Sequence, residues 1–151
     1  MKKFLYLAVM LISLSAAATT KPVPDVTEKV LKAFQQTFSG AEDVTWNETA
    51  ENFQANFKMS EIKVRAKYDS EGNLLETVRY YGEKNLPLNI VARLKKRYAN
   101  QEVFGVTEIS SENEMNYYIV LKDAKHWYTV KADPYGNLQQ TEKFKNASTN
   151  K

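Results

Sequence analysis

The chain has 151 residues, with 21 basic and 18 acidic side chains, one histidine and no cysteine. The lack of cysteine excludes disulfide bonds, thiolate metal sites and a lipid-modified cysteine anchor. The small net charge of +3 excludes the strongly basic surface of a typical nucleic-acid-binding domain.

Residues 1–20 are typical of a secretory signal peptide. Lys2 and Lys3 form its positive start, Phe4 to Leu14 its apolar run and Ala16 to Ala18 its cleavage site. The apolar run is about half as long as a membrane-spanning helix requires. We therefore expect cleavage near Ala18, a periplasmic or secreted mature protein, and no membrane contact after cleavage. Cleavage removes two lysines and no acid, which leaves 19 basic residues against 18 acidic ones.

The first element expected after the signal is a helix from Asp25 to Ser39. Asp25 and Glu28 have the spacing of a helix-capping pair, and Gly40 is the residue type that closes helices in the left-handed conformation. Apolar residues recur on one side of this helix, which predicts that it covers a sheet with that side. They are Val30, Leu31, Phe34 and Phe38.

Strands are expected next, because the hydrophobic pattern changes to a period of two. Segments 53–59 and 63–68 alternate apolar and polar residues, as half-buried antiparallel strands do. Ser60-Glu61 and the segment 69–73 predict hairpin turns, with Gly72 and Asn73 tolerating positive φ. Segment 74–81 predicts a fourth strand, which completes the first unit.

The same order recurs in the second half of the chain. A helix opens near Pro87, strands follow at about 106–111, 115–123, 126–133 and 138–144, and the turn sequence at 69–74 returns as Asp133-Pro-Tyr-Gly-Asn-Leu138. The predicted fold class is therefore α+β, with two tandem repeats. Each repeat has one helix followed by a four-stranded antiparallel sheet, with the helices on one face. The predicted units are residues 21–83 and 84–145, with a flexible tail at 146–151; whether the two sheets join edge to edge is left open.

This pattern resembles the PepSY-like family described as β-lactamase-inhibitor-like (BLIP-like), whose members are secreted bacterial proteins. The resemblance implies a two-lobed, exported, non-enzymatic protein that docks onto another protein, with inhibition of a secreted or periplasmic enzyme as one form of that binding. The chain has no cysteine and so departs from disulfide-bearing inhibitors of similar layout. Its second half also departs from its first, because it has Phe104 to Val106 where the first half has Val-x-Trp. The matching residues are Phe34 and Phe38, Ala41 to Trp46, Ala66 to Asn73 and Leu86-Pro87.

The sequence contains no convincing catalytic or metal-binding pattern, so we expect no enzyme and no cofactor. His126 is the only histidine, and its place in a predicted strand favours a partly buried structural role. The Asp-x-x-Gly-Asn turns lack the glycine and bidentate Glu positions of a calcium-binding loop. Acidic pairs that could suggest a hydrolase are typical of solvated hairpin ends; they are Glu48 with Glu51 and Glu112 with Glu114.

The strand alternation predicts a binding surface on the side of the sheet that no helix covers. Large aromatic and basic side chains recur there in alternate positions, and such residues anchor protein interfaces and steer toward an acidic partner. The predicted contact residues are Trp127, Tyr118, Val120, Tyr81, Lys63, Arg65, Lys67, Thr129 and Lys131. The expected partner is another protein outside the cytoplasm, and the sequence indicates no oligomeric state.

An alternative is a carrier of a small apolar ligand. Its pocket would lie between the sheet and the helices and be lined by Phe34, Phe53 and Tyr128.

Overall fold

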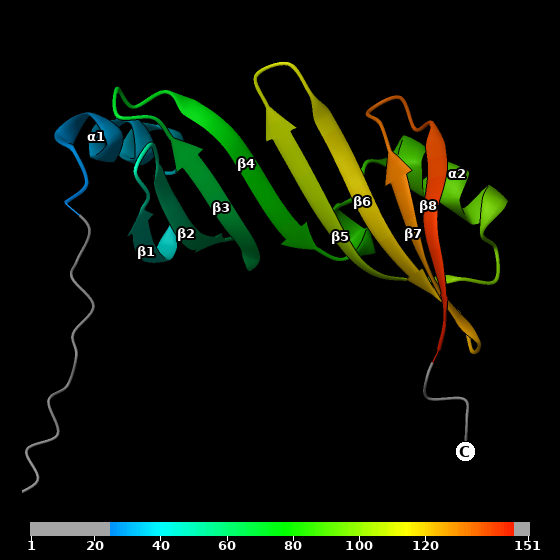
Figure 1. The fold of residues 1–151 in the computed structure, drawn as a ribbon. Helices are drawn as coiled ribbons and strands as arrows, with labels where there is room; N and C mark the ends of the chain where they lie inside the picture. Colours follow the sequence, from blue (N-terminus) through cyan, green and yellow to red (C-terminus); the bar gives the residue numbers. More distant parts are fainter. Residues whose placement is uncertain (1–24, 147–151) are drawn as a thin grey trace, which may run out of the picture.

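The computed structural model describes residues 25–146, which form one antiparallel eight-stranded sheet in the order β1 to β8 (Figure 1). Helix α1 precedes β1 and helix α2 follows β4, after a short 3-10 turn at Glu83–Asn85. The elements are α1 (Glu28–Thr37), β1 (Glu42–Glu48), β2 (Phe53–Met59), β3 (Ile62–Tyr68), β4 (Leu74–Tyr81), α2 (Leu88–Arg97), β5 (Glu102–Ser111), β6 (Met115–Lys122), β7 (His126–Ala132) and β8 (Leu138–Lys145).

The single sheet corrects the expected fold class. The prediction of two repeats with a four-stranded sheet each is wrong, because β4 pairs with β5 from Glu76 opposite Ser111 to Tyr81 opposite Val106. Two separate sheets would leave the inner edges of β4 and β5 without hydrogen-bond partners, and pairing those edges satisfies both. The predicted signal peptide and residues 147–151 of the predicted tail lie outside the described residues.

The start and end of α1 also differ from the prediction. Thr27, and not Asp25, is the N-cap residue, and its Oγ1 accepts a hydrogen bond from the Val30 backbone N–H at 3.4 Å. At the other end, the Phe38 N–H donates to the Phe34 carbonyl at 2.8 Å. Gly40 is not left-handed; among the described glycines, φ is positive at Gly72 and Gly136.

Both helices pack on the same face of the sheet, as the register shows. Phe57, opposite Val64, faces α1, and the same face continues through Arg79, Glu108 and Tyr117 toward α2. Each helix covers its own buried apolar cluster. Around α1 these residues are Val30, Phe34, Phe53, Ala55, Phe57, Val64, Ala66 and Tyr68; around α2 they are Leu86, Ile90, Leu94, Tyr98, Val106, Tyr117, Ile119, Leu121, Tyr128, Val130 and Ala132.

The duplicated Asp-x-x-Gly-Asn turns join β3 to β4 and β7 to β8. In each, the first Asp accepts hydrogen bonds from the backbone N–H and side-chain amide of the Asn four residues later. These bonds lower the pKa values of Asp69 and Asp133. Each turn also touches a helix: Glu71 forms an ion pair with Lys29 of α1, and Asn89 of α2 donates to the Pro134 carbonyl at 2.9 Å. The repeated motif therefore fixes turns against helices.

Candidate functional site

The sheet surface opposite α1 and α2, hereafter the helix-free face, is the candidate site. Along β2, β3 and β7 its side chains alternate with the buried ones, and on β4 and β6 it also carries the buried residues Val78 and Asn116. The strand register places one row of residues across it, from β2 to β7. The members of this central row are Lys58, Lys63, Tyr80, Thr107, Tyr118 and Lys131.

All the predicted contact residues except Tyr81 lie on the helix-free face. Lys63, Arg65 and Lys67 follow one another along β3. Tyr118 and Val120 lie on β6, opposite Lys131 and Thr129 of β7, and Trp127 of β7 lies opposite Lys122.

Tyr81 lies on the helix-covered face, so its predicted placement on the helix-free face is wrong. It is opposite Val106, and its hydroxyl donates to Glu108 Oε2 at 2.5 Å. The neighbouring Tyr80 is on the helix-free face instead, and it is 41% exposed. Both residues are aromatic, so composition could not tell which of them faces solvent.

An aromatic patch, formed by Phe104, Trp127 and Phe144, lies at one end of the helix-free face. The rings of Phe104 and Trp127 meet edge to face with centroids 4.8 Å apart, and Phe144 lies opposite Trp127 on β8. Phe104 and Phe144 are 60% and 55% exposed. The Lys122 ammonium lies 5.3 Å from the centre of the Phe104 ring.

Sequence reasoning did not place Phe104 and Phe144 on the helix-free face. Phe104 lies ahead of the predicted start of its strand, in a bulge where Val103 pairs with Leu121 and Gly105 with Val120. A bulge shifts the alternation of side chains, and so it brings Phe104 against Trp127. Phe144 could have been found from the pairing of β8 with β7.

The basic residues of the helix-free face differ in their ionic partners. In the second half, Lys122 and Lys131 each lie 3.7 Å from a carboxylate, of Glu102 and Glu114 respectively. In the first half, Lys63, Arg65 and Lys67 form no ion pair within residues 25–146.

A buried ionic network lies on the opposite face, between the two apolar clusters. Glu108 is only 7% exposed and accepts from Arg79 Nη1 at 3.0 Å as well as from Tyr81. Burial, followed by the Glu108 carboxylate, raises the pKa of Tyr81 well above its usual value. These bonds join β4 to β5 where the two halves meet, which indicates a structural role.

His126 and the acidic pairs do not form a catalytic arrangement in the described part of the chain. His126 Nδ1 lies 3.8 Å from Asp123 Oδ1. That Asp already accepts from the Tyr128 hydroxyl and from the Lys125 and His126 backbone N–H groups, which lower its pKa. Within residues 25–146 no three acidic or histidine side chains gather as a metal site would require, and no helix is long and apolar enough to span a membrane.

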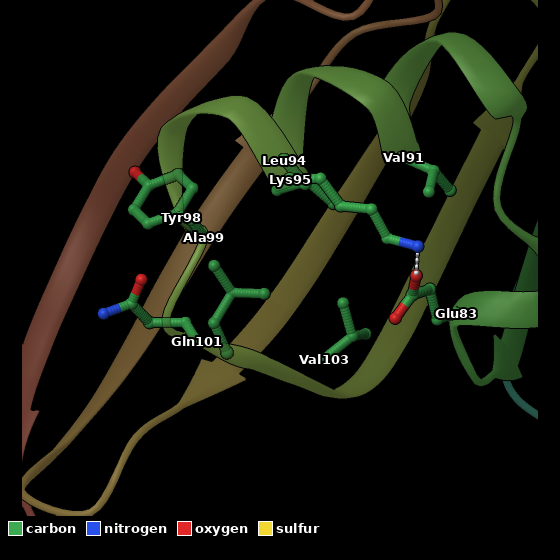
Figure 2. A pocket seen from close by; sticks show the side chains of 9 residues that line it. Glu83, Val91, Leu94, Lys95, Tyr98, Ala99, Gln101 and Val103 are labelled. Carbon is green, nitrogen blue, oxygen red and sulfur yellow. Dashed lines mark ion pairs between the residues drawn. The ribbon is translucent and has the colours of Figure 1, made fainter.

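The apolar pocket expected between sheet and helices is not formed by the predicted residues. Phe34 and Phe53 belong to the cluster under α1, and Tyr128 belongs to the cluster under α2. A different cavity of about 310 Å³ lies beside α2, where Glu83 and Lys95 form an ion pair at 3.1 Å (Figure 2). Its apolar lining includes Val91, Leu94, Val103 and Leu121.

No family model and no curated protein sequence matches the chain. Solved structures do match it, and the fold can be compared with theirs. A BLIP-like protein from Bacteroides fragilis has a TM-score of 0.63 at 16% identity, over 83% of this chain and 91% of that one. The chain has a BLIP-like fold.

Two further Bacteroides structures share this fold. A DUF2874 family protein from Bacteroides uniformis has a TM-score of 0.59 at 14% identity, over 79% of this chain and 88% of that one. A candidate periplasmic protein from Bacteroides eggerthii has a TM-score of 0.60 at 12% identity, over 83% and 92%. The BLIP-like part of the predicted resemblance is thus confirmed as a fold, and at these identities the similarity extends no further.

Proposed function

We propose that this protein is an exported, non-enzymatic binding module that docks onto another protein through its helix-free face. The observation that carries the proposal is the aromatic patch, in which Phe104 and Phe144 expose more than half of their surfaces beside Trp127. Clustered exposed aromatic rings lose unfavourable contact with water when a partner covers them, and Trp and Tyr are frequent anchors of protein interfaces.

The rest of the face supports this proposal. Tyr80 and Tyr118 continue the aromatic surface along the central row, and Lys131 lies 5.8 Å from the centre of the Tyr118 ring. Basic side chains around the rings favour fast association with a partner of opposite charge. Restraint of a secreted or periplasmic enzyme is the specific form of binding that the BLIP-like fold suggests.

Export is part of the same proposal. It is supported by the signal-peptide pattern of residues 1–20 and by the periplasmic description of the Bacteroides eggerthii protein with the same fold. The PepSY-like relationship also stays a prediction.

The ligand-carrier alternative has less support, because Phe34, Phe53 and Tyr128 do not share a cavity. The form of this alternative that remains is a small apolar ligand bound in the cavity beside α2. Native mass spectrometry of the purified protein would detect a bound apolar molecule.

The proposal is tested by affinity capture with residues 19–151 as bait, from periplasmic and extracellular extract of the source organism. Trp127→Ala should abolish capture of a protein that the wild type retains. The matched control is Tyr135→Ala, since Tyr135 is an exposed aromatic residue on the β7–β8 turn and outside the aromatic patch.

Circular dichroism should show that both variants are folded. Equal capture by the wild type, Trp127→Ala and Arg65→Ala would refute the helix-free face as the binding surface. Loss of capture with Tyr135→Ala alone would place the contact at the β7–β8 turn, beside α2.

A further inference from the structure

The basic side chains of β3 lie beside a hollow in the helix-free face. The hollow has a volume of about 290 Å³, and its lining includes Asn56, Lys58, Lys63, Arg65 and Tyr80. Its lining residues lie on β1 to β4, whereas the aromatic patch lies on β5, β7 and β8.

The charges around this hollow are not balanced. Lys58 lies directly opposite Lys63, and like charges in that position repel each other. Asp43 compensates Lys58 with a contact of 2.7 Å, and this contact lowers the pKa of Asp43. Lys63 and Arg65 have no carboxylate within ion-pairing distance in residues 25–146. The hollow therefore has an excess of positive charge that an anionic group can neutralise.

The spacing of the cations matches an extended polypeptide. Lys63, Arg65 and Lys67 are alternate residues of one strand, so their Cα atoms lie about 7 Å apart. Alternate residues of a second extended chain have the same spacing, and their side chains point to the same side. Carboxylates at alternate positions can thus meet successive cations without a change of register.

We propose that the hollow beside β3 takes an extended acidic segment of the partner protein, with carboxylates at alternate positions over Lys63 and Arg65. This inference rests on the proposed function and adds the chemistry of the partner. Tyr80 and Asn56 border the cations and supply hydrogen-bonding groups beside the segment. Glu76 lies opposite Lys67, and so the most positive part of the row is the end at Lys63 and Arg65.

The probe is a fluorescein-labelled peptide of about ten residues in which Glu alternates with Thr, a pattern that favours the extended form. Its isomer, with all Glu residues contiguous, has the same charge but cannot direct every carboxylate to one side. Fluorescence anisotropy should show tighter binding of the alternating peptide, with an affinity that falls as salt is added.

The test variant is Lys63→Glu with Arg65→Glu, and it should weaken binding of the alternating peptide by about tenfold. Lys63→Gln with Arg65→Gln should give a smaller loss. The matched control is Lys32→Glu with Lys96→Glu, because these exposed residues of α1 and α2 have the same charges on the opposite side of the sheet. This control should bind the peptide as the wild type does.

Several results would overturn the inference. They are no binding by the wild type, equal binding of the two peptide isomers, or an equal loss of affinity in the test and control variants. Tighter binding of single-stranded DNA, inorganic phosphate or anionic lipid vesicles would overturn it too, because the hollow would then be specific for phosphate. If capture of a partner depends on Trp127 while the peptide results are negative, this inference fails and the proposed function stands.

Discussion

We expect the two glycines of the duplicated turns to differ in their tolerance of alanine. Both have positive φ, +88° at Gly72 and +83° at Gly136, so an added Cβ costs about 1–2 kcal/mol at either site. Their surroundings differ. A Cβ on Gly72 would lie 2.9 Å from the Lys29 carbonyl oxygen, which is part of the α1 backbone, whereas a Cβ on Gly136 would lie 2.8 Å from the Arg93 Cδ.

The long Arg93 side chain can rotate away, and the α1 backbone cannot. Forcing the new methyl group against this rigid backbone costs a further ~1–3 kcal/mol. The free energy of unfolding should therefore fall by roughly 2–5 kcal/mol for Gly72→Ala and by about 1–2 kcal/mol for Gly136→Ala.

Urea denaturation followed by far-UV circular dichroism measures both values. Arg93→Ala is the internal control, since in that background Gly136→Ala should keep only the cost of its backbone conformation. An equal loss of stability in the two single variants, or a larger loss for Gly136→Ala, would refute the distinction between a rigid and a movable neighbour.

Three further predictions concern the sheet and its polar contacts. Ile119→Ala removes part of a buried side chain and should lower the free energy of unfolding by about 2–5 kcal/mol. Because the sheet is continuous, single-tryptophan variants that keep either Trp46 or Trp127 should report the same single unfolding transition, shifted by this mutation. Two separate transitions would contradict one cooperative sheet. Tyr81→Phe should lower stability by about 1.5–3 kcal/mol at neutral pH through loss of a hydrogen bond to a buried carboxylate. Because the folded-state pKa of Tyr81 is raised, its contribution is present below pH ~10 and lost at higher pH, so urea titrations should show a smaller alkaline loss in Tyr81→Phe than in the wild type. Asp123 has a lowered pKa, so its contribution is present above pH ~4 and lost as the pH falls; acid titration should show a flatter profile for Asp123→Asn, and identical profiles would contradict this account.

The predicted strands agree closely with the observed ones where side chains alternate clearly. Lys63, Arg65 and Lys67 alternate with Val64 and Ala66, and burial of the apolar pair places the basic residues on the opposite face. The same reasoning could not place Tyr81, because Tyr80 beside it is equally suited to either face. The register of β4 against β3, which shifts between Lys67 and Tyr68, decides which of the two tyrosines faces the helices.

The residues of the helix-free face could be predicted only in part. Trp127 and Tyr118 were found from their strand positions, because each strand places its own side chains by a local rule. Phe104 could not be found in this way, since its orientation depends on a bulge in β5 relative to β6. The network of Glu108 with Arg79 and Tyr81 likewise exists only because β4 and β5 pair.

The sequence by itself determined the elements and their order. The apolar stripes of the two helices, the alternation in the strands and the Asp-x-x-Gly-Asn turns all depend on residues a few positions apart. Only the tertiary structure decided that the strands form one sheet, that Tyr80 and Phe104 lie on the helix-free face and that Tyr81 lies opposite. Those outcomes depend on hydrogen bonds between strand edges that are distant in the chain, and neither composition nor local spacing encodes which edges meet.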